Sequence, residues 1–112
     1  MEYVSTRGAA PALGFCDTLL AGLASDGGLY VPAAWPRVAH GASNATFAAR
    51  AAEIIAPFVG DEIDSATLQR LCGEAYSSFR DPLVAPLREL GENRWLLELF
   101  HGPTLEIGRA HV

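Results

Sequence analysis

The 112-residue sequence contains no lysine, because all 8 of its basic residues are arginines. The absence of lysine therefore excludes, for these 112 residues, any reaction that needs a lysine amine, such as Schiff base formation with a carbonyl cofactor. Cysteine is also scarce, since Cys16 and Cys72 are too few for a disulfide scaffold. No apolar run approaches the roughly 18 residues of a transmembrane helix, so we expect no membrane partner. The start of the chain lacks the basic and apolar regions of a signal peptide, and the expected location is cytoplasmic.

The residues that are present are typical of a soluble globular domain, with 50% hydrophobic residues, 19% charged residues and a net charge of −5. A negative protein repels a phosphate backbone, so no nucleic acid partner is expected. The histidines and cysteines show no metal-ligand spacing, which predicts no metal site. The carboxylates of Asp61, Glu62 and Asp64 are best explained as a solvated helix N-terminus, where they complement the helix dipole.

Apolar periodicity and turn residues divide the chain into three helices, short strands and a C-terminal hairpin. The second and third helices are joined by a short connection, which favours antiparallel packing. Cys72 lies on the apolar stripe of the third helix, where a buried thiol acts as a small hydrophobe. The predicted elements are a strand at 3–6, a helix at 15–24, an extended segment at 29–32, a helix from Phe47 to near Gly60 capped by Asn44 or Thr46, a helix after an Asp64 cap, and strands at 84–90 and 94–100 around a three-residue loop.

Two polar segments are candidates for a binding site. Ser5, Thr6 and Arg7 bring two hydroxyls and a guanidinium next to Gly8, a group that can hold a phosphate or carboxylate, although a surface loop explains it as well. Residues 101–104 place an imidazole and a hydroxyl on a stiff glycine-proline turn directly after a strand that we expect to be buried. The residues alone leave both the site and the plain turn open for this second segment.

Two further features have structural explanations. The Gly27-Gly28 pair lacks the glycine spacing of phosphate-binding loops, so it predicts a turn. Cys16 stands at a helix start, where the dipole favours a thiolate, but no base accompanies it and a structural role is expected.

Three phrases together resemble the N-terminal part of threonine synthase: YVSTRG at 3–8, GLASDGGLYVP at 22–32 and LELFHGPTL at 97–105. The resemblance implies an α/β protein, the α+β N-terminal subdomain of a tryptophan-synthase-like enzyme of fold type II with pyridoxal phosphate as cofactor. It implies the conversion of O-phosphohomoserine and water to threonine and phosphate, in which the cofactor acts as an electron sink. It also implies that His101 and Thr104 line the site, and that Ser5, Thr6 and Arg7 contact substrate phosphate or anchor the strand.

The sequence departs from the family pattern at its end. In the family, the lysine that holds the cofactor follows the histidine-glycine-proline-threonine turn and falls on Gly108 of this chain. Residues 106–112 can be encoded as GAG ATC GGA AGA GCA CAC GTC, which after its first base resembles a common short-read sequencing adapter that continues with a stop codon. We therefore expect a threonine synthase N-terminal domain at 1–105 and a non-native tail at 106–112.

Two hypotheses about function follow. In the first, the chain is an N-terminal fragment of threonine synthase that is inactive and binds no pyridoxal phosphate by itself, with the remainder of the enzyme as its packing partner. In the second, it is a stand-alone, non-catalytic interaction module built on the same small domain. For the fragment, we expect the hairpin to expose Trp95, Leu97 or Leu99, which predicts an aggregation-prone or partly ordered product.

Overall fold

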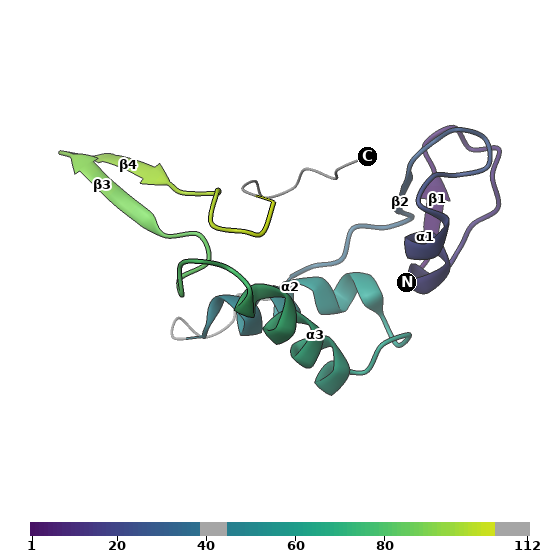
Figure 1. Ribbon diagram of the computed structural model, residues 1–112. Coiled ribbons are helices and arrows are strands. Elements are labelled where there is room, and N and C mark those ends of the chain that lie inside the picture. Colours follow the sequence, from purple (N-terminus) through teal and green to yellow (C-terminus); the bar gives the residue numbers. More distant parts are fainter. Residues whose placement is uncertain (39–44, 105–112) are drawn as a thin grey trace.

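The computed structural model describes residues 1–38 and 45–104, and this part contains three α-helices and two separate two-stranded antiparallel sheets. Figure 1 shows a small N-terminal sheet with α1, a central pair of helices, and a hairpin that extends away from the helices. This arrangement confirms the predicted three helices with short strands and a C-terminal hairpin. The alternative cap Asn44, the Gly108 position and the tail at 106–112 lie outside the described residues.

The N-terminal sheet joins β1 (Tyr3–Ser5) to β2 (Tyr30–Pro32), with Val4 opposite Val31. Both strands are slightly shorter than predicted. Helix α1 (Phe15–Ala21) starts where the periodicity places it but ends three residues before the predicted limit. It ends early because Gly22 adopts a φ of 67° and donates its N–H to the Thr18 carbonyl, which turns the chain.

The central helices α2 (Phe47–Val59) and α3 (Ser65–Ser77) begin at caps that the sequence predicts. The side chain of Thr46 accepts from an amide in the first turn of α2, and the side chain of Asp64 does so for α3. Helix α2 continues through Pro57 and ends at Gly60, whose φ is 67°.

The core of the described structure lies between these two helices. Val59 is fully buried, and α3 runs back along α2 (Figure 1), so the predicted antiparallel packing is confirmed. The Tyr3 hydroxyl donates to the Phe58 carbonyl at 2.8 Å and joins β1 to α2. The buried residues of this core are Ala52, Val59, Leu68 and Cys72, which confirms the predicted core position of the cysteine.

The hairpin consists of β3 (Leu87–Gly91) and β4 (Arg94–Leu97), which are shorter than the predicted strands. Val84 has a φ of 64°, and a β-branched residue in this left-handed conformation cannot continue an extended strand. Gly91 pairs with Arg94, so the loop contains two residues and the prediction of three was wrong. The register shifts between Glu89 and Gly91, which accommodates the extra residue within the strand.

Large apolar side chains are uncovered at both ends of the molecule. Trp95, Leu97 and Leu99 are 55%, 52% and 41% exposed, which agrees with the exposure expected of the hairpin in a fragment. The separate prediction that the strand before the second polar segment is buried was wrong for this chain. On α1, Leu19 and Leu20 are 68% and 86% exposed, so the described residues leave these two side chains largely uncovered, whereas Phe15 at the start of the helix packs against the core. The chain exposes 8178 Å², whereas a compact monomer of this mass exposes about 6,000 Å².

Replacing Trp95 and Leu97 with glutamate is expected to reduce self-association of the 112-residue chain severalfold, because it removes an exposed apolar strand face. The Ala66→Glu, Gln69→Glu variant adds the same two charges at exposed positions on α3 and serves as the control. Light scattering during size-exclusion chromatography measures the change. A wild-type chain that remains a monodisperse monomer with a sharp thermal transition would contradict the prediction.

Candidate functional site

Asp26 connects the first polar segment to the turn that precedes β2. The Ser5 hydroxyl donates to the two Asp26 carboxylate oxygens at 2.7 and 2.8 Å, and the amides of Ala9, Ala10 and Gly28 donate to them at 2.9 to 3.0 Å. These bonds, led by that from Ser5, stabilise the charged carboxylate and lower the Asp26 pKa from 3.8 to about 2. A single buried hydroxyl and one carboxylate therefore fix the whole segment from 5 to 10.

Thr6 and Arg7 also bond to residues of this turn. Thr6 Oγ1 accepts from the Leu29 amide at 3.0 Å, and Arg7 Nη1 donates to the Asp26 carbonyl at 3.0 Å. Gly27 adopts a φ of 77°, and a Cβ there would stand 2.7 Å from Arg7 Nη1, so the glycine pair forms the predicted turn. The two hydroxyls thus anchor the fold, whereas the exposed guanidinium has five N–H donors. Ligand binding by this segment stays a prediction.

The second polar segment begins at His101, whose imidazole is held by the preceding strand extension. His101 Nε2 lies 2.7 Å from Glu98 Oε2, and its ring stacks at 4.8 Å on that of Phe100 with a tilt of 36°. The Arg80 amide donates to the His101 carbonyl at 2.9 Å, which ties the turn to the loop after α3. His101 is only partly exposed, and its orientation is fixed on both its side-chain and its main-chain side.

Close packing around Gly102 leaves little room for a side chain. A Cβ on this buried residue would stand 3.1 Å from two ring atoms of Phe79. Thr104 is exposed at the end of the described segment. The polar turn at 101–104 is therefore held by residues around 79–81 and 98, whereas the polar segment at 5–7 is held by residues 26–29. Figure 1 shows β1 and the hairpin on different sides of the central helices. The roles of His101 and Thr104 in a site stay predictions.

Glu62 caps α1 rather than the helix that follows it. Its carboxylate accepts from the Phe15 and Cys16 amides at 2.6 and 2.9 Å, and these bonds hold the Glu62 pKa below its ordinary value. The predicted grouping of Asp61, Glu62 and Asp64 at one solvated helix start is therefore wrong for Glu62 and confirmed for Asp64. Burial and the Glu62 carboxylate raise the pKa of the Cys16 thiol, which disfavours a thiolate nucleophile.

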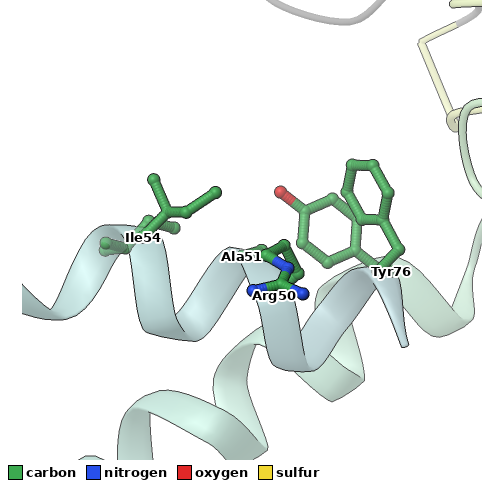
Figure 2. A pocket seen from close by; sticks show the side chains of 6 residues that line it. Arg50, Ala51, Ile54 and Tyr76 are labelled. Carbon is green, nitrogen blue, oxygen red and sulfur yellow. The ribbon is translucent and has the colours of Figure 1, made fainter. Parts of the chain in front are cut away.

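A shallow groove of about 280 Å³ lies between α2 and α3. Figure 2 shows Tyr76 from α3 beside Arg50 and Ala51 of α2, and the Arg50 guanidinium is paired with Glu53 at 2.9 Å. The groove lacks the convergent polar groups that orient a small-molecule ligand, so it suits an apolar side chain better than a substrate. Its lining residues are Phe47, Arg50, Ala51, Ile54, Ile55 and Tyr76.

Within 1–38 and 45–104, no group of three or more histidine, cysteine, aspartate or glutamate side chains could hold a metal ion. Over the same residues, no helix combines the length and the apolar character that a membrane crossing needs. The geometry defines the class: a small α+β unit with two polar turns that carboxylates hold in place and with exposed apolar side chains on α1 and on the hairpin.

Comparison with known proteins identifies the family. The profile of the threonine synthase N terminus matches residues 2–76. The threonine synthase of Pseudomonas aeruginosa is 51% identical over 109 residues, which are 94% of this chain and 23% of the relative. That of Schizosaccharomyces pombe is 38% identical over 93% of this chain and 21% of its own length. The chain belongs to the threonine synthase family, as the three sequence phrases indicate.

Solved structures show the same fold. The threonine synthase of Brucella melitensis, determined with pyridoxal phosphate bound, is 48% identical and superposes with a TM-score of 0.83 over 94% of this chain and 24% of its own. The yeast threonine synthase, at 35% identity, gives a TM-score of 0.81 over 91% of this chain and 22% of its own. The chain thus spans about a quarter of the length of the relatives that it matches.

Replacing Asp26 with asparagine is expected to lower the hydrogen-exchange protection of the Ala9 and Ala10 amides about tenfold near neutral pH, the effect of one or two lost hydrogen bonds. Because the folded pKa is depressed, the wild-type contribution is present above the ordinary value of 3.8 and is lost as the pH falls through about 2. The variant should show no such pH dependence.

NMR measurement of the hydrogen-exchange rates of the Ala9 and Ala10 amides between pH 6 and pH 2 tests this prediction. The rates are corrected for intrinsic exchange, and the pH range extends down to the Asp26 pKa of about 2. Asp17→Asn, at an exposed carboxylate on α1, is the control and should leave the Ala9 and Ala10 amides unchanged. Equal protection in the Asp26 variant and the wild type at pH 6 would contradict the role assigned to this carboxylate.

Proposed function

We propose that this chain is the N-terminal portion of a threonine synthase that converts O-phosphohomoserine and water to threonine and phosphate. The observation that carries the proposal is the match of 94% of the chain to the fold of the Brucella melitensis threonine synthase at 48% identity. The two free thiols, Cys16 and Cys72, suit the reducing cytoplasm in which we expect the enzyme to work.

The residues of this chain do not by themselves fit pyridoxal phosphate. A carbonyl cofactor is tethered through a lysine amine, and the sequence contains none, with Gly108 at the position where the family resemblance expects one. A polypeptide limited to these 112 residues is therefore proposed to be inactive and to bind no cofactor covalently at a side chain. When bound in the whole enzyme, the cofactor supplies the electron sink for the reaction.

His101 and Thr104 are proposed to line the site of the whole enzyme. Support comes from the fixed turn on which they lie, since Glu98 orients the imidazole and Gly102 packs directly on Phe79. For Ser5 and Thr6, the bonds to Asp26 and Leu29 favour anchoring of the turn. Arg7 is proposed as the one member of the first segment that reaches a phosphate, because its side chain is exposed and its guanidinium suits that anion.

The remainder of the enzyme is proposed as the partner that covers the exposed apolar surface. The relatives are about four times as long as the matched segment, and the chain exposes more surface than a compact monomer of its mass. Leu87 and Leu97 lie opposite each other on the hairpin and are both more than half exposed, which leaves an apolar strand face for this contact. A stand-alone module would instead have to tolerate this face in water.

Residues 106–112 are proposed to be a non-native tail derived from a sequencing adapter. We expect a long read across this locus to show a small residue, phenylalanine and lysine at 106–108, directly after Leu105, as in the family pattern. Recovery of the same seven codons from an independent library, in front of a stop codon, would refute the proposal and leave Gly108 as a native residue.

Joining residues 1–105 to the complementary C-terminal part of the Pseudomonas aeruginosa relative, with which the chain is 51% identical, is expected to restore phosphate release from O-phosphohomoserine. The purified 112-residue chain should release none, because it offers no lysine amine. A coupled phosphate assay measures both proteins, and the chimera with its cofactor lysine replaced by alanine is the control. Phosphate release by the isolated chain, or a folded, cofactor-loaded chimera without activity, would contradict the proposed function.

A further inference from the structure

Glu98 lies at the meeting point of the hairpin and the His101 turn. One carboxylate oxygen, Oε2, is 2.7 Å from His101 Nε2, and the side chains of both residues are only 16% exposed. The Glu98 amide donates to the Pro86 carbonyl at 3.0 Å, so the main chain at 98 is fixed to the start of the hairpin. The main chain that carries this carboxylate is therefore joined to the residues before β3.

The second Glu98 oxygen is also occupied. Arg88 Nε lies 3.6 Å from Glu98 Oε1, and Arg88 Nη2 lies 3.4 Å from Asp81 Oδ2. A chain of alternating charges thus runs from Asp81 through Arg88 and Glu98 to His101. This arrangement restricts the rotation of Glu98, because each of its two oxygens has its own partner.

The chemistry of the contact fixes which ring nitrogen carries a proton. A carboxylate only accepts hydrogen bonds, so His101 Nε2 must be the donor, whether the ring is neutral or charged. In the neutral ring, Nδ1 then remains as the acceptor. A histidine without such a partner exchanges between both tautomers and rotates about its side-chain bonds.

We propose that Glu98 is a positioning residue, which holds the His101 imidazole with Nε2 protonated and Nδ1 available to a ligand in the whole enzyme. The inference rests on the proposed function for the site role of His101, but the effect of Glu98 on the ring can be measured without activity. Arg88, which also pairs with Asp81, contacts the other oxygen of this carboxylate.

A double-mutant cycle in the active chimera tests the proposal. Glu98→Ala is expected to lower kcat about tenfold. This is the lower end of the range of losses caused by mutating a hydrogen-bond partner that orients a histidine ligand. Glu98→Gln should retain most of the activity, since its amide oxygen still accepts from Nε2. Glu92→Ala, in the exposed hairpin loop, is the matched control and should match the wild type. In a His101→Asn background, Glu98→Ala should cause no further loss.

Nitrogen-15 NMR of the histidine rings gives the second readout, with the His101 signals identified by their disappearance in His101→Asn. The wild type and Glu98→Gln should show the Nε2-protonated tautomer, and Glu98→Ala should show a mixture of both. An unchanged tautomer in Glu98→Ala, or fully additive losses in the cycle, would overturn the proposal. A chimera without activity that still shows this tautomer change would refute the proposed function and leave the positioning by Glu98 intact.

Discussion

The packing of α2 against α3 is the contact on which the other described parts depend. Val59 is fully buried there, and Ala52 in the same core is 3% exposed. The N-terminal sheet is joined to it through the Tyr3 hydroxyl on the Phe58 carbonyl, and α1 is joined to it through Glu62 in the connection between the two helices. Loosening the helix pair would therefore release both contacts at once.

Outside this core, hydrogen bonds to carboxylates hold segments in place that apolar packing would hold in a larger domain. Asp26 and Glu62 each join segments that are distant in the sequence, since Asp26 fixes a loop and Glu62 caps a helix. Glu98 contacts the imidazole of His101 three residues further along the same segment. Bonds to charged groups are stronger than neutral ones and are directional, so a few of them define local geometry where little apolar surface is buried. The two polar turns receive their shape from such bonds.

The exposed apolar side chains accompany a chain that is short relative to its homologues. The threonine synthases that it matches are about four times as long, which supports the proposal that the remainder of the enzyme covers this surface. Leu20 on α1 is 86% exposed and Trp95 on β4 is 55% exposed, so both of these elements have uncovered apolar side chains. The groove beside Tyr76 is lined by Phe47 and Ile54, which are exposed as well.

The sequence by itself determined the three helices, the cap at Asp64, the core position of Cys72 and the family, because these depend on local periodicity, side-chain chemistry and ordered phrases. For α2 it offered Asn44 or Thr46 as the cap, and the structure shows Thr46 in that role. The sequence did not determine the bond from Glu62 to α1 or that from Glu98 to His101, since an exposed or half-buried carboxylate has many candidate partners until the chain folds. The exposure of β4 was decided by tertiary structure as well. An alternation of apolar residues shows that a strand has a face to bury, but only the three-dimensional arrangement shows whether anything covers it.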